Sequence, residues 1–255
     1  MSHRIFLAAV AAALVAVAAP AMAQETASPW IGLYVGGNVG GNWGGTQTRT
    51  TVAPGGGAVV IPPADVSAIN LPYPSTHNSA GIVGGLEGGY GYRAGDVMVG
   101  LETDIQSFNV AESNAATFPS SVRSNPTINY ALAHLVNTHW LWTLRPRVGY
   151  MTGRWMIYGT GGLALSDVQL QASYADNRVP PNLVSLSTSS TRAGWIAGGG
   201  VAYAITPQWS IKAEYLYTDL GTIHAANTPP SGFVTLQGRS TVRSNILRLG
   251  VDFRF

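Results

Sequence analysis

The last eleven residues of the chain alternate between apolar and polar side chains. One face of this segment, read as an extended strand, carries Leu247, Leu249, Val251, Phe253 and Phe255, and the other carries Ile246, Arg248, Gly250, Asp252 and Arg254. An alternating strand that ends on an aromatic residue is typical of a transmembrane β-barrel. Because lipid cannot satisfy an open sheet edge, such strands have to close on one another.

The first 23 residues have the organisation of a cleaved secretory signal peptide. A basic start at Arg4 precedes an apolar run over 5–19, and Ala21-Met22-Ala23 supplies small residues for cleavage. That run is shorter than the roughly 20 apolar residues that a membrane-spanning helix needs. We therefore predict export through the inner membrane and one barrel domain over residues 24–255.

The composition excludes several classes of protein. No long apolar stretch follows residue 23, which argues against a helical membrane protein. The chain has no Cys, so it is not a disulfide scaffold. Without Arg4, 13 Lys and Arg (14 − 1) face 12 Asp and Glu, and this balance leaves no basic footprint for nucleic acid.

Eight segments show the two-residue periodicity of strands, which predicts an all-β, eight-stranded antiparallel up-and-down barrel. They cover about 31–41, 80–92, 97–109, 136–150, 155–167, 192–205, 208–220 and 245–255. Three connections are tight, at 93–96, 151–154 and 206–207. Four are long and rich in Ser, Thr, Asn, Pro and Gly, at about 42–79, 110–135, 168–191 and 221–241. This alternation predicts an outer-membrane barrel with short periplasmic turns, long extracellular loops and both termini in the periplasm.

The strand pattern places ten charged residues in the barrel interior. The carboxylates are Glu87, Glu102, Asp104, Glu214 and Asp252, and the cations are Arg145, Arg147, Lys212, Arg248 and Arg254. An eight-stranded barrel is only wide enough for side chains to fill. Buried charges there have to be paired. The equal numbers favour a plug of salt bridges over an open pore, with Glu102 and Asp104 facing Arg145 and Arg147.

Four segments of the chain resemble sequence motifs of one protein family. They are Trp30-Ile31-Gly32-Leu33-Tyr34-Val35-Gly36-Gly37, Val99-Gly100-Leu101-Glu102-Thr103-Asp104, the hairpin from Thr143-Leu144-Arg145-Pro146-Arg147 to Tyr158-Gly159-Thr160-Gly161-Gly162, and Lys212-Ala213-Glu214-Tyr215-Leu216-Tyr217. They resemble the small outer-membrane β-barrel proteins of α-proteobacteria, the RopB-like "porin family", which are distant relatives of the OmpA transmembrane domain. The resemblance implies a structural and surface role in the outer membrane, and some members are described as haemin-binding. Ala202 stands where the family usually has a Glu.

The sequence leaves three functions open. The first is a monomeric, non-enzymatic barrel that supports envelope integrity and displays loops; the others are a narrow porin for ions or small solutes, and haemin or host-surface binding through the loops. We expect no metal or cofactor, because the histidines after residue 23 (His77, His134, His139 and His224) lack the tight spacing of a metal site. We also expect no catalytic site, because the chain has no G-x-S-x-G nucleophile elbow. The expected partners are outer-membrane lipid, lipopolysaccharide and, through Phe253 and Phe255, the barrel-assembly machinery.

Overall fold

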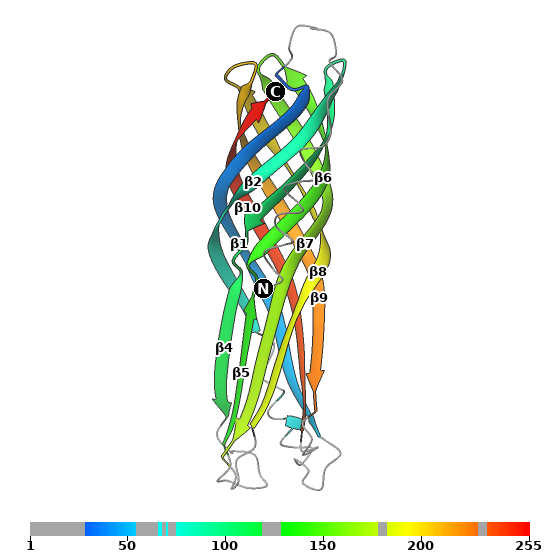
Figure 1. The fold of residues 1–255 in the computed structure, drawn as a ribbon. Helices are drawn as coiled ribbons and strands as arrows, with labels where there is room; N and C mark the ends of the chain where they lie inside the picture. Colours follow the sequence, from blue (N-terminus) through cyan, green and yellow to red (C-terminus); the bar gives the residue numbers. More distant parts are fainter. Residues whose placement is uncertain are drawn as a thin grey trace, which may run out of the picture.

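The computed structural model describes residues 29–54, 66–67, 70, 75–118, 129–177, 183–228 and 234–255, so the predicted signal peptide lies outside the described residues. These residues form a tall antiparallel barrel (Figure 1). Its strands are β1 (Gly32–Pro54), β2 (Ser75–Ala94), β3 (Val97–Ser107), β4 (Ala111–Phe118), β5 (Tyr130–Asn137), β6 (Trp140–Thr152), β7 (Trp155–Asp176), β8 (Leu183–Ala204), β9 (Trp209–Asn227) and β10 (Val234–Arg254).

Eight of these strands close the half of the barrel that carries the tight turns, which we call the turn half. The ring runs β1-β2-β3-β6-β7-β8-β9-β10, and β10 pairs with β1 from Tyr34↔Arg254 upward. Each pair is antiparallel, and the pairing of the first strand, β1, with the last, β10, closes the ring. The fold class predicted from the periodicity is confirmed.

The strand count differs from the predicted eight because the structure has two further strands, β4 and β5. They continue the lines of β3 and β6 beyond short breaks at residues 108–110 and 138–139, and β4 and most of β5 fall inside the predicted loop 110–135. The two breaks face each other, and the Thr138 hydroxyl donates to the Phe108 carbonyl at 2.8 Å and accepts from the Val110 amide at 2.9 Å. A single side chain therefore satisfies the backbone groups that the interruption leaves without strand partners.

Beyond the breaks, the wall separates into two four-stranded sheets, and we call this part the loop half. One sheet is β4-β5-β7-β8, and the other is β2-β1-β10-β9. The pairing of β2 with β3 ends at Gly84↔Ser107, and that of β8 with β9 ends at Trp195↔Asp219. A β-bulge in β9 marks the second separation: Gly221, at φ 71°, supplies the left-handed conformation that such a bulge requires.

The predicted long loops 42–79, 168–191 and 221–241 are therefore wrong over much of their length. β1 continues to Pro54, β2 begins at Ser75, β7 continues to Asp176 and β8 begins at Leu183, while β9 and β10 cover 221–227 and 234–241. The Ser and Thr content of these segments is typical of loops. Thr is also a good strand former, and above the apolar band a strand does not need an apolar outer face.

The outer surface of the turn half is apolar and bounded by aromatic residues. Leu33, Val39, Leu86, Leu249 and Val251 are among its exposed side chains. At the turn end Trp155 packs on Tyr203 with ring centroids 4.7 Å apart, and at the other border Trp195 packs on Tyr217 at 5.4 Å. From Leu33 to Trp43 the band is about 25 Å tall, for a strand rise near 3.3 Å and a tilt near 40°. This height matches the apolar band of a transmembrane barrel.

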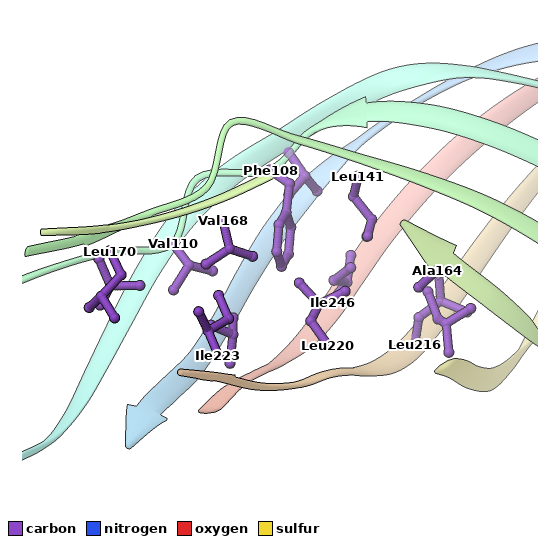
Figure 2. Close-up of a cluster of buried hydrophobic side chains, with 14 residues drawn as sticks. Phe108, Val110, Leu141, Ala164, Val168, Leu170, Leu216, Leu220, Ile223 and Ile246 are labelled. Atoms are coloured by element: carbon purple, nitrogen blue, oxygen red, sulfur yellow. The ribbon is translucent and has the colours of Figure 1, made fainter. Parts of the chain in front are cut away.

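The interior is layered along the barrel axis. An apolar layer at the turn end contains Trp30, Met98 and Met156, and the charged residues follow it. A second apolar layer of fourteen buried side chains then fills the barrel, with Phe108, Leu141 and Ile246 among them (Figure 2). A third apolar layer joins the two sheets of the loop half, from Val52 and Leu236 to Tyr130, Tyr174 and Leu186. The charged residues are therefore enclosed between apolar layers.

Candidate functional site

All ten charged residues predicted to face inward lie inside the turn half. They come from β2 (Glu87), β3 (Glu102, Asp104), β6 (Arg145, Arg147), β9 (Lys212, Glu214) and β10 (Arg248, Asp252, Arg254). None is more than 5% exposed. Such burial is tolerated only where partners replace water.

Glu102 lies at the centre of this cluster, which we call the charged core. Its Oε1 accepts from Arg145 Nη2 at 2.6 Å, and its Oε2 accepts from Arg147 Nη1 at 3.0 Å and from Lys212 Nζ at 2.9 Å. The Tyr34 hydroxyl donates to the same oxygen at 2.6 Å. Glu102 and Arg145 are direct cross-strand neighbours on β3 and β6. One carboxylate thus ties together four strands of the wall.

Arg145 and Arg248 connect Glu102 to the remaining acids. Arg145 also bonds Asp104 Oδ2 at 2.8 Å and Glu214 Oε1 at 3.3 Å. Arg248 Nε donates to Glu214 Oε2 at 2.7 Å, and its Nη1 reaches Asp104 Oδ1 at 3.3 Å. These charge-assisted bonds cross the barrel from β3 and β6 to β9 and β10. The barrel centre is therefore braced by hydrogen bonds between opposite strands.

The remaining charged residues extend the charged core toward the turn end. Lys212 Nζ lies 3.0 Å from Glu87 and 3.8 Å from Asp252. Arg254 has a different environment: its guanidinium lies 5.3 Å from the Tyr34 ring centroid and 5.9 Å from that of Trp30. Cation–π contact of this kind partly replaces a carboxylate.

Sequence reasoning missed the neutral members of the charged core. Tyr34 donates to Glu102, Asn38 Nδ2 donates to Glu87 at 3.0 Å and the Tyr158 hydroxyl donates to Glu214 at 3.3 Å. The available signal was their position, because each lies on the inward face of its strand. Buried polar side chains of such a face are expected to be hydrogen-bonded.

A glycine on β1 makes room for one of these charges. Gly40 faces the interior beside β10, and a Cβ at this position would lie 2.8 Å from Arg248 Cβ and closer still to the Leu247 carbonyl oxygen. Real Cβ atoms do not approach that closely, so a larger residue would displace Arg248. The glycine-rich phrase of β1 therefore serves close packing.

A smaller polar cluster lies between the sheets of the loop half. The Thr48 hydroxyl donates to Glu112 Oε2 at 3.1 Å and lies 3.0 Å from the Ser240 hydroxyl, while His134 Nε2 lies 3.3 Å from Glu112 Oε1. All four side chains are buried. Thr48 and Ser240 belong to one sheet and Glu112 and His134 to the other, so the cluster joins the two sheets.

His139 and His224 lie on the surface. His139 Nδ1 lies 2.6 Å from Asp167, and His224 is exposed on β9. His77 belongs to β2 rather than to a loop, and so does His224 to β9. Within the described ranges, no group of three or more acidic or histidine side chains is arranged to hold a metal ion.

Chemically, the charged core holds equal numbers of acids and cations and is desolvated. Most of its charged groups are hydrogen-bonded to one another, while Asp252 Oδ1 and the Nε and Nη1 atoms of Arg254 have no hydrogen-bond partner among the described residues. A general acid or base has to reach a substrate proton, but Glu102 and Asp104 are enclosed by their cationic partners and by the apolar layers. The arrangement of these two carboxylates suits a brace across the barrel better than a reacting pair.

Comparison with known proteins places these features in context. Residues 9–255 match the family model described as the outer membrane protein beta-barrel domain. The 31 kDa outer-membrane immunogenic protein of Brucella melitensis is 33% identical over 179 residues, which cover 69% of this chain and 68% of the relative. A 22 kDa outer membrane protein of Rhizobium leguminosarum bv. viciae is 27% identical over 57% of this chain and 56% of its own.

Among solved structures, the outer membrane protein OprG from Pseudomonas aeruginosa matches with a TM-score of 0.43 and 12% identity, over 91% of this chain and 100% of that one. Neisserial surface protein A matches with a TM-score of 0.35 and 16% identity, over 91% and 100%.

Proposed function

Because this chain belongs to the outer membrane protein β-barrel family and its relatives are outer-membrane proteins, we propose that it is a closed, non-enzymatic barrel that supports envelope integrity. In this proposal the turn end faces the periplasm. The loop half then projects from the cell as a two-sheet structure and displays its outer faces and connections.

The burial of the charged core carries this proposal. A conducting lumen needs a continuous water path along charged or polar walls. Here Arg145 and Glu214 are at most 1% exposed, and the apolar layer around Phe108 and Leu141 covers them on one side. Moving a hydrated ion through this layer would require the ion to lose its water. These features support a closed barrel over the narrow porin.

The equal numbers of acids and cations support the same role. A selective channel presents rings of one charge sign to the passing ion, whereas the charged core joins five carboxylates to Arg145, Arg147, Lys212 and Arg248. Its effect is to link the wall internally. A wall tied in this way resists lateral deformation in the membrane.

Planar-bilayer conductance of the refolded mature protein tests the proposal. Folding is first checked by heat-dependent gel mobility, and a large trimeric porin in the same lipid serves as the positive control. We expect no discrete conductance steps from the folded protein. Reproducible steps would contradict the closed barrel and make transport the leading function.

A further inference from the structure

Two arginines lie side by side on the outer face of the loop half. Arg49 on β1 is the direct cross-strand partner of Arg239 on β10, and both are exposed. Directly opposed residues in an antiparallel pair have Cβ atoms about 5 Å apart. Like charges at this spacing destabilise a sheet, and among the described residues neither arginine has a carboxylate within ion-pair distance. The arrangement is costly for the free protein and suited to an anion that both side chains hold.

Neighbouring side chains extend the same surface. The strand beside β10 contributes His224, which is the register partner of Arg239. Arg243 lies on the same face of β10, two side chains nearer the aromatic border, and its Nε donates to Asp219 at 2.8 Å. We call Arg49, Arg239, Arg243 and His224 the basic strip. Among the described residues, Asp219 is the carboxylate that pairs with this strip, which keeps an excess of positive charge.

Over its described residues, the opposite sheet has no such surface. The exposed positions of β4, β5, β7 and β8 in the loop half are occupied mainly by Ala, Ser, Thr and Gln, and the Arg192 side chain of β8 faces inward. Among the described residues of the loop half, the exposed basic side chains thus lie on β1, β10 and β9.

The height of the strip relates it to the membrane. Trp43 marks the aromatic border and is the register partner of Asn245. Arg243 is two residues beyond this border and Arg49 six, which corresponds to about 5 and 15 Å along the axis for a rise of 3.3 Å and a tilt near 40°. Arginine at this level meets the phosphorylated sugars of the outer leaflet. Guanidinium groups bind phosphate through paired hydrogen bonds.

We propose that the basic strip binds phosphate groups on the saccharide headgroup of lipopolysaccharide. In this proposal the guanidinium groups of Arg49 and Arg239 both donate hydrogen bonds to one phosphate. Polar side chains on the same face, Gln47 and Gln237, flank the arginine pair along their strands and donate to sugar hydroxyls. This proposal rests on the orientation given under the proposed function, in which the loop half is outside the cell.

Calorimetric titration of the refolded mature protein with deacylated lipopolysaccharide tests the site, because the deacylated saccharide is soluble and removes membrane insertion from the measurement. We expect saturable binding that is at least about tenfold weaker for the dephosphorylated saccharide and for Arg49→Gln or Arg239→Gln, which is the effect of losing one charge-assisted contact. Arg154→Gln, in a turn at the opposite end, removes the same charge and should leave binding unchanged.

Three results would overturn the proposal. The first is equal affinity of the wild type and the double variant Arg49→Gln/Arg239→Gln for the saccharide, and the second is a loss of affinity in Arg154→Gln as large as in Arg49→Gln. The third is displacement of the saccharide by inorganic phosphate at the same concentration as by the free saccharide, which would make the strip a general anion surface. Arg49→Lys keeps the charge but not the paired geometry, and we expect intermediate affinity. Each variant is first checked for heat-dependent gel mobility, and Arg49→Gln should be at least as stable as wild type without ligand, because it removes a repulsion.

The orientation is tested separately. The chain has no cysteine, so Gln237→Cys can be labelled in intact cells with a membrane-impermeant maleimide, and Ala94→Cys, at the exposed turn end of β2, serves as the control. Labelling of residue 237 alone supports the orientation. Labelling of residue 94 alone would contradict the proposed orientation and the strip's place in the outer leaflet, while the titration would still report whether the strip binds phosphate.

Discussion

Arg145 and Glu102 are cross-strand neighbours on β6 and β3, and the Arg145 guanidinium donates to the Glu102 carboxylate at 2.6 Å with both side chains at most 1% exposed. The pair is completely removed from water, so each side chain depends on the other. It joins the two strands that are interrupted at the border between the turn half and the loop half.

Removing one member of this pair should destabilise the barrel strongly. Arg145→Met removes the bonds from Arg145 to Glu102 and Asp104 and leaves the charged core with one carboxylate more than it has cations. We expect a loss of about 3–5 kcal/mol in the free energy of unfolding. Urea unfolding in detergent, followed by tryptophan fluorescence, measures it. The double variant Arg145→Met/Glu102→Gln should cost less than the sum of the single variants; strict additivity would mean that the two groups do not interact.

Emptying the apolar layer should cost stability through a cavity. Phe108 is fully buried in this layer (Figure 2), and Phe108→Ala should lower the free energy of unfolding by about 3–5 kcal/mol. Leu249→Ala on the exposed outer face is the matched control, with an expected loss well below that. A cost for Phe108→Ala no larger than for the control would show that the layer is not tightly packed.

The polar cluster of the loop half should hold the two sheets together. Thr48→Val removes the hydroxyl that donates to Glu112 and bonds Ser240, while keeping the shape of the side chain. We expect a loss of about 1–3 kcal/mol, with faster proteolysis of the loop half and unchanged resistance of the turn half. Mass spectrometry of the fragments locates the cuts; Thr51→Val, on the outer face of the same strand, should behave like wild type.

Hydrogen exchange should reveal where the two sheets separate. Between β8 and β9, register pairing stops at Trp195↔Asp219, and beyond it Asn227 Nδ2 donates to the Ser185 carbonyl at 2.7 Å. Beyond this point, β8 and β9 each have one unpaired edge, and the backbone amides that point to that edge lack a strand partner. We therefore expect the amides of residues 183–194 and 222–227 to exchange faster than those of residues 195–204. Equal protection along the whole of β8 would contradict the separation.

The last aromatic residue should affect assembly more than stability. Phe255 is 74% exposed and touches Phe253 at a ring-centroid distance of 5.3 Å. Phe255→Ala should therefore change the free energy of unfolding by no more than about 0.5 kcal/mol. If the assembly machinery binds this residue, the same variant should lower the amount of folded protein in the outer membrane. Comparing refolding in detergent with quantitative blots of membrane fractions separates the two effects. Unchanged levels in cells would contradict the assembly role.

The sequence largely predicts which side chains point into the barrel and which point to its outer surface. A strand alternates its side chains with a period of two, so Arg248 and Asp252 share one face and Leu247 and Leu249 the other. Within the apolar band lipid enforces this alternation. Beyond the apolar band that constraint ends. The strands of the loop half are rich in Ser, Thr and Gly, so their composition predicts loops although the structure has strands there.

The sequence by itself determined the barrel class, the outer-membrane location and that the ten charged side chains of the charged core face inward. Period-two patterning and an apolar outer face are local properties of each strand. The tertiary structure decided which charges meet, where the wall divides into two sheets, and that Arg49 lies opposite Arg239. These depend on the register between strands far apart in the chain, and hydrogen bonding and packing across the closed barrel set that register.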